Sequence, residues 1–327
     1  MTQTCIAMIK IATAGLVMLC TGLATAQSAY PVKPIRFIVP FPPGGATNIV
    51  ARLVGQKLTD SMGQQVIVDN RPGGNTIIGN EALARSAADG YTIGMTTSTL
   101  VISPHLLTNL PYDAFRDFIP VATLVATDYV LAVHPSVAAN TLQEFIALAR
   151  SRPGQLNYAT SAAGGPTHLA GELFNIMAGV RIQHIPYKGG RPALTDLLGG
   201  QVQLTFSAAA QNIPYIRSGK LKAIAIAGDA RSSALPQVPT FTEAGLPGFN
   251  PKNWLGVSVP TGTSKAIIDR LSTEIARVLA MPDIRDELAG QGVDPFISTP
   301  EQFAALMKAD SALYGRIIKT ANIKIDN

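Results

Sequence analysis

The strongest constraint on the fold is an alternation of two hydrophobic patterns along almost the whole chain. Short runs rich in Val and Ile are separated by segments whose apolar residues recur at helical spacing. The strand-like runs cover residues 35–39, 65–68, 91–95, 129–133, 156–159, 182–185, 202–206, 221–226 and 254–259. The helical segments include 141–150, 167–177, 193–198, 264–279 and 300–319. This alternation predicts an α/β fold built on parallel sheets.

The N-terminal segment has the pattern of a cleaved signal peptide. An apolar run from Ile11 to Leu23 follows Lys10 and precedes Ala24-Thr25-Ala26. The run is shorter than the roughly 20 residues that a membrane-spanning helix needs. We therefore expect residues 1–26 to be removed and the mature protein to be exported. Both cysteines, Cys5 and Cys20, lie in this segment, so no disulfide is expected in the mature chain. A lipid anchor at Cys20 is disfavoured because Leu19 stands where a small residue is needed.

The remaining chain of about 300 residues exceeds one average domain and predicts two. Two extended segments, 121–133 and 221–228, have the pattern of passages between domains, because loops containing Pro or Gly follow each of them. The expected division gives a discontinuous first lobe, 28–122 and 229–327, around a continuous second lobe, 123–228. Two α/β lobes joined by two strands form a cleft, and ligands bind at the carboxyl ends of such strands.

The charge pattern argues against nucleic acid as a partner. The chain has a formal net charge of +5. Its basic residues are scattered, with nothing denser than Arg150-Ser151-Arg152 or Lys220-Leu221-Lys222. This distribution is typical of an ordinary solvated surface.

One segment in each predicted lobe runs from a strand through a Gly-rich turn into a helix start. They are residues 39–48, "VPFPPGGATN", and residues 159–168, "ATSAAGGPTH". Neither contains the Gly-Lys-Ser/Thr of a nucleotide-binding loop or a dinucleotide fingerprint. The free N–H groups and partial positive charge of a helix start suit a carboxylate. Two such turns facing each other could hold an acid from both ends. The same residues also serve as well-capped βα connections, so this alternative stays open.

The sequence offers little for catalysis. Ser161 and His168 lie close together, but no Gly-x-Ser-x-Gly segment surrounds the serine. A periplasmic hydrolase using this pair is the weakest alternative. The four histidines include no i,i+4 pair and have no cysteine partners, so neither a metal nor another cofactor is expected.

Seven segments, taken together, resemble the Bug (TctC-like) family of receptors associated with tripartite tricarboxylate transporters. They are "PIRFIVPFPPGGATNIVAR", "VDNRPGG", "ADGYTI", "NYATSAAGGPTHLAGELF", "IPYKGGRPALTDLLGGQVQ", "GKLKAIAI" and "WLGVSVPTGT". They occur in order, with short gaps, over essentially the whole mature chain. The resemblance implies a two-lobed type II periplasmic binding-protein fold that closes around a small organic acid by hinge motion of the crossing strands.

The resemblance also implies which residues hold the ligand. In the family, backbone amides and ordered waters from the two turns hold one carboxylate. On the first lobe this points to Pro42, Gly44, Gly45, Ala46, Thr47 and Asn48. On the second lobe it points to Ser161, Ala163, Gly165, Thr167 and His168. Ser207, which follows the predicted strand 202–206, is a further candidate, and Thr97 and Ser98 at another strand end are weaker ones.

Two departures from the family pattern bear on ligand preference. Family members commonly carry Asp where this chain has Asn48, and often another Asp where it has Ser207. A carboxylate in the pocket favours a ligand amine, so its absence disfavours amino acids. Small residues at Ala162, Ala163 and Ala208–Ala210 leave room for a flat ring. We therefore expect a dicarboxylate or an aromatic carboxylate.

The resemblance implies an inner-membrane tripartite permease as the partner, to which the periplasmic receptor delivers its ligand. Nothing in the sequence demands an oligomer, so we expect a monomer. The same fold would also serve a co-sensor that docks on a sensor kinase, and the sequence leaves this alternative open.

Overall fold

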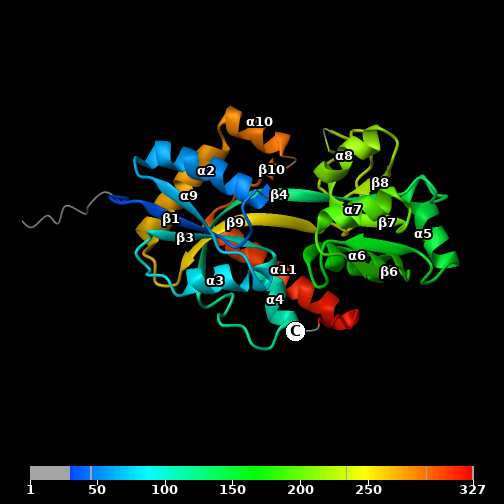
Figure 1. The fold of residues 1–327 in the computed structure, drawn as a ribbon, viewed down its shortest axis with the longest axis horizontal. Coiled ribbons are helices and arrows are strands. Elements are labelled where there is room, and N and C mark those ends of the chain that lie inside the picture. Colours follow the sequence, from blue (N-terminus) through cyan, green and yellow to red (C-terminus); the bar gives the residue numbers. More distant parts are fainter. Residues whose placement is uncertain (1–29, 45, 233, 292, 326–327) are drawn as a thin grey trace, which may run out of the picture.

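The computed structural model describes residues 30–44, 46–232, 234–291 and 293–325. The predicted signal peptide and Gly45 lie outside the described residues. The described chain forms two α/β lobes that share one long strand, β4 (Phe118–Val133) (Figure 1). The two-lobed α/β prediction is therefore confirmed.

The first lobe is a sheet covered by helices. Its strands, besides the first part of β4, are β1 (Ile35–Val39), β2 (Val66–Asn70), β3 (Thr92–Thr97), β9 (Lys252–Pro260) and β10 (Asp294–Pro295). Its helices are α2 (Ala46–Met62), the 3-10 turn η1 (Gly74–Thr76), α3 (Ile77–Ala84), α4 (Thr99–Leu106), α9 (Lys265–Leu279), α10 (Pro282–Gly290) and α11 (Pro300–Thr320).

The second lobe contains the last part of β4 and a smaller sheet. Its further strands are β5 (Asn157–Thr160), β6 (Gln183–Pro186), β7 (Leu204–Ala208) and β8 (Lys222–Ile226). Its helices are α5 (Leu142–Ser151), α6 (Pro166–Ala178), α7 (Gly190–Leu198) and α8 (Ala209–Arg217).

The sheets are mixed, whereas the alternation predicted parallel ones. In the first lobe β1 pairs in parallel with β2 and β3, and in the second lobe β5 pairs in parallel with β6 and β7. The crossing strands β4 and β9 pair antiparallel with each other, β9 pairs antiparallel with β3, and β4 with β7 and β8. Strands that carry the chain between lobes have no helical crossover to enforce parallel pairing.

The chain passes between the lobes along β4 and returns along β9 (Figure 1). In β4, residues up to Asp128 pair with β9, and residues from Tyr129 onward pair with β7 and β8. The junction between these two halves is the expected position of the hinge.

The predicted second passage, 221–228, was placed too early in the chain. That segment forms β8, which pairs with β4 inside the second lobe. The following residues also pack on the second lobe, where the ring of Phe249 lies 5.7 Å from that of Phe174 and 5.9 Å from that of Phe206. This apolar packing favours a lobe boundary near Asn250 over the predicted one at Asp229. No local sequence pattern indicates it.

Helix α11 contacts both lobes. It packs against α4 and β4 and also against α6 of the second lobe. Its Phe303 is fully buried edge-to-face against Trp254, with ring centroids 5.0 Å apart. The end of β9 nearest the hinge is therefore held by the C-terminal helix.

Candidate ligand-binding site

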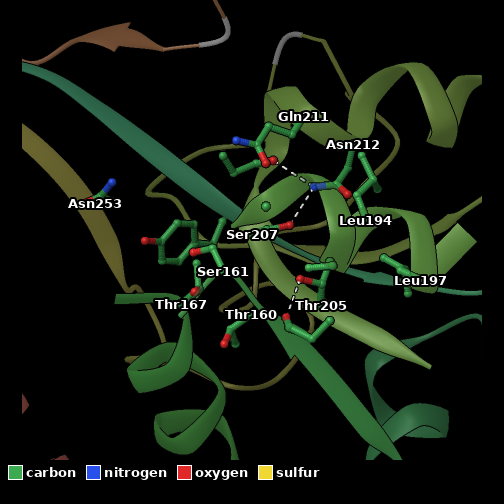
Figure 2. Close-up of a pocket in the computed structure, with 15 residues that line it drawn as sticks. Thr160, Ser161, Thr167, Leu194, Leu197, Thr205, Ser207, Gln211, Asn212 and Asn253 are labelled. Atoms are coloured by element: carbon green, nitrogen blue, oxygen red, sulfur yellow. Dashed lines mark hydrogen bonds between the residues drawn. The ribbon is translucent and has the colours of Figure 1, made fainter. Parts of the chain in front are cut away.

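A cavity of about 220 Å³ lies at the carboxyl ends of β5 and β7 (Figure 2). Two residues of the crossing strands, Tyr129 and Asn253, line it together with residues of the second lobe. The polar second-lobe residues are Thr160, Ser161, Thr167, Thr205, Ser207, Gln211 and Asn212. The others are Ala159, Gly190, Ala193, Leu194, Leu197 and Ala208. None of these lining residues carries a formal charge, and burial raises the pKa of Tyr129, which keeps its phenol neutral.

Three helices begin at the cavity. Thr167 in the first turn of α6, Gly190 at the start of α7 and Gln211 in the first turn of α8 all line it. The first N–H groups of a helix have no partner inside the helix, and its N-terminus carries a partial positive charge. An anionic group in the cavity would therefore meet hydrogen-bond donors and partial positive charge without a cationic side chain.

The turn between β5 and α6 is held by its own side chains. Gly164 adopts φ +69°, a left-handed conformation that suits glycine. Its N–H donates to His168 Nδ1 at 2.9 Å. The Thr160 hydroxyl donates to the carbonyl of Ala162 at 3.1 Å. The predicted site residue His168 thus supports the turn from behind and does not line the cavity.

His168 stacks on His184, with ring centroids 3.6 Å apart and an interplanar angle of 11°. His184 Nε2 lies 2.6 Å from the Thr160 hydroxyl. Burial lowers the pKa of His168 to about 4, and burial together with His168 lowers that of His184 to about 3. Both rings are neutral at neutral pH. Since the turn already occupies Nδ1 of His168, the ring is poorly placed as a general base for Ser161.

Most polar groups of the second-lobe wall are already engaged within the protein. Thr205 donates to the carbonyl of Ala159 at 3.0 Å. Asn212 donates to the Ser207 hydroxyl and to the carbonyl of Ala208, both at 2.9 Å. The hydroxyl of Thr167, by contrast, is buried without a protein partner. A buried hydroxyl in this state is available to a bound molecule.

The first-lobe turn lies at the end of β1, and none of its described residues lines this cavity. Asn48 is buried, and its Oδ1 accepts from the N–H of Gly44 and from Arg52 Nε, both at 3.2 Å. Its Nδ2 donates to Asn70 Oδ1 at 3.1 Å. Pro42 and Gly44 are exposed, and Ala46 and Thr47 begin α2. The polar side chain of Asn48 therefore organises the turn, and the role of the turn in ligand binding stays a prediction.

The second-lobe predictions divide into two groups. Ser161, Thr167 and Ser207 line the cavity, whereas Ala163 is exposed on the turn and Gly165 caps α6. At the end of β3, Thr97 and Ser98 are both buried. Ser98 donates to Asn253 Oδ1 at 2.9 Å and so contacts the cavity through that residue.

Several residues that line the cavity were not predicted from the sequence. Gln211 and Asn212 follow the end of β7 closely, and the strand-end argument applied to Ser207 could have included them. Tyr129 and Asn253 belong to the crossing strands, and Leu194 to the inner face of α7. No local pattern marks these three, because only the packing of the lobes brings them to the cavity.

Among the described residues, no cluster of three or more His, Cys, Asp or Glu side chains could hold a metal ion. In the same part of the chain, no helix combines the length and apolar character needed to cross a membrane.

Comparison with known proteins gives a consistent family match. The sequence profile of the "Tripartite tricarboxylate transporter family receptor" matches residues 50–323. Protein BugT of Bordetella pertussis is 37% identical over 319 residues, which cover 96% of this chain and 98% of BugT.

Solved structures agree with this match. A structure described as a periplasmic transporter is 40% identical and superposes with a TM-score of 0.78, covering 91% of this chain and 100% of the other. The protein Rpa4515 of R. palustris, solved with adipate, is 33% identical with a TM-score of 0.78, covering 90% of this chain and 99% of its own. A structure described as a TctC solute binding protein from Polaromonas is 30% identical with a TM-score of 0.79, covering 89% of this chain and 99% of its own. The expected periplasmic binding-protein fold is confirmed, and the matching family is one of receptors rather than enzymes.

Proposed function

Because the chain belongs to the tripartite tricarboxylate transporter receptor family, we propose that it captures a small organic carboxylate in the cavity between its lobes for uptake by a tripartite permease. The observation that carries the proposal is the uncharged, polar cavity at the starts of three helices. Such a cavity suits an anion because backbone N–H groups and helix dipoles stabilise negative charge. The adipate bound by the neighbour Rpa4515 is a ligand of this class.

The ligand class follows from the side chains that the cavity lacks. No carboxylate is among the described lining residues, so a ligand ammonium group would enter without a counter-charge. Leaving an ammonium group unpaired in a buried site is costly. The proposed preference is therefore for a dicarboxylate or an aromatic acid over an amino acid.

The test is a binding screen of the purified mature protein after removal of any bound ligand. Adipate, malate, citrate, benzoate, aspartate, glutamate and adipamide are compared by thermal shift and calorimetry. Binding to the folded state alone stabilises by about 4 kcal/mol at a thousandfold excess over Kd. We expect a large shift with at least one acid that lacks an amine and none with adipamide. Binding of only aspartate or glutamate would refute the class preference, and no binding of any acid would refute the proposal.

A further inference from the structure

Asn253 is the lining residue that the first-lobe strand β9 contributes to the cavity. It lies opposite Thr127 of β4 in the antiparallel pair, next to the hinge. Neighbouring residues of a strand point to opposite faces. Asn253 accordingly lines the cavity, whereas Lys252 and Trp254 do not. Figure 2 shows Asn253 on the opposite side of the view from Leu194 and Leu197.

The backbone of Asn253 is held from both sides. Trp254 is fully buried, and its Nε1 donates to Asp310 Oδ2 of α11 at 2.7 Å. Lys252 Nζ donates to Asp229 Oδ2 at 2.7 Å. These two contacts hold the backbone on either side of Asn253, so its side chain projects from a fixed position at the wall of the cavity.

Ser98 fixes which end of the Asn253 carboxamide faces the cavity. Its side chain has no exposed surface, and its hydroxyl donates to Asn253 Oδ1 at 2.9 Å. The carboxamide has one acceptor oxygen and one nitrogen with two N–H donors. Ser98 holds the oxygen, and the two N–H donors have no protein acceptor among the described contacts, so these donors are the groups available to a ligand.

The Asn253 carboxamide differs from that of Asn212, which also lines the cavity. Asn212 uses its Nδ2 on Ser207 and Ala208, as described above. Asn253 Nδ2 has no such protein acceptor among the described contacts. The Thr167 hydroxyl in the same cavity is also without a protein partner. Asn253 and Thr167 therefore both offer the cavity N–H or O–H donors that no protein group uses.

We infer that Asn253 selects a carboxylate over an amide or amine at the hinge end of the cavity, and that Ser98 is its positioning residue. The inference rests on the proposed function, in that it takes this cavity as the ligand site. A carboxylate only accepts hydrogen bonds and matches two N–H donors, whereas an amide presents its own N–H groups to them. Bonds to a charged acceptor are also about twice as strong as neutral ones.

The test compares matched acids and amides, adipate with adipamide and benzoate with benzamide, by calorimetry on the purified mature protein. We expect the wild type to bind the acid of at least one pair more than tenfold more tightly than the amide. Asn253→Asp replaces the donor with an acceptor of the same shape, so the amide should bind more tightly than the acid. Gln237→Glu adds the same charge at an exposed position outside the cavity lining and should leave the ratio unchanged.

Ser98 is tested by the same acid-to-amide ratio, which a merely structural role would not move. Ser98→Ala allows the Asn253 carboxamide to rotate and exchange the positions of its oxygen and nitrogen, which should reduce the acid-to-amide ratio about three- to tenfold. Ser98→Thr keeps the hydroxyl and should keep the wild-type ratio. If Asn253→Asp binds acid and amide in the wild-type ratio, the inference is wrong although the receptor function stands. If the wild type binds neither acid, the proposed function fails and the inference with it.

Discussion

At the scale of single residues, two threonines of the cavity wall differ in one respect. The Thr205 hydroxyl donates to the carbonyl of Ala159, whereas the Thr167 hydroxyl is buried without a protein partner. A buried hydroxyl that makes no hydrogen bond costs about 1–3 kcal/mol of stability. A bound ligand that hydrogen-bonds to the Thr167 hydroxyl would offset this loss of stability at the start of α6.

Thr167→Val tests this interpretation because valine has nearly the same shape and carries a methyl group in place of the hydroxyl. We expect the free energy of unfolding to stay the same or to rise by about 1 kcal/mol, while acid binding weakens about three- to tenfold. Urea unfolding and calorimetry measure the two effects. The matched variant Thr205→Val breaks an existing hydrogen bond and should lower stability by about 1 kcal/mol. Equal losses of stability in the two variants would contradict the interpretation.

At the scale of elements, the position of α6 depends on a close contact with β5. A Cβ placed on Gly171 would lie 2.3 Å from the Tyr158 ring. The Tyr158 hydroxyl donates to Glu172 Oε1 at 2.6 Å, which fixes the ring against the helix. Glycine at this position lets α6 approach the sheet and brings its first turn to the cavity.

Gly171→Ala should therefore destabilise the protein by about 1–3 kcal/mol, because the added methyl group overpacks the contact with Tyr158. Acid binding should weaken too, since the start of α6 must shift. Gly290→Ala in α10 is the matched control, because nothing lies within 4 Å of its added Cβ. There we expect a gain of about 0.4–1 kcal/mol. The melting temperature should be lower for Gly171→Ala than for Gly290→Ala, and the opposite order would refute the role of the close contact with Tyr158.

At the scale of the whole molecule, the hinge contains a partly buried carboxyl group. Asp128 is the last β4 residue paired with β9 before the strand enters the second lobe. Burial raises its pKa to about 6; Lys252 lowers it, while Asp294 and Asp229 raise it further. The folded state thus favours the protonated form. As pH rises from about 4, the unfolded chain ionises this group first, so its contribution to stability is lost up to pH 6.

Asp128→Asn removes this titration. The free energy of unfolding of the variant minus that of the wild type should increase by about 1–2 kcal/mol between pH 4 and pH 6 and stay level above, after discounting for partial exposure. Urea unfolding at pH 4, 5, 6 and 7.5 measures the difference. His168 and His184, whose lowered pKa values give the opposite pH slope, are common to both proteins and cancel. A difference that does not change with pH would show that Asp128 titrates normally.

The sequence alone determined the identity of the elements and the chemistry of their ends. Period-2 and period-3.6 patterns, Gly-rich turns and capping residues act within a few positions, so the α/β class and the start of α6 beside Ser161 and Thr167 could be predicted. The two lobes followed from chain length and the same patterns. Asn48 and His168 were predicted to hold the ligand; in the structure both support their turns by hydrogen bonds, and their contact with a ligand stays a prediction.

The tertiary structure alone decided which side chains meet. Ser98 and Asn253 are 155 positions apart, and their contact depends on the pairing of β3 with β9. The chain re-enters the first lobe at β9, after the residues around Phe249 have packed on aromatic rings of the second lobe. No local sequence pattern indicates this packing. Local patterns are fixed by interactions between near neighbours in sequence. The cavity and its donors arise from burial of surfaces that come together only when the whole chain folds.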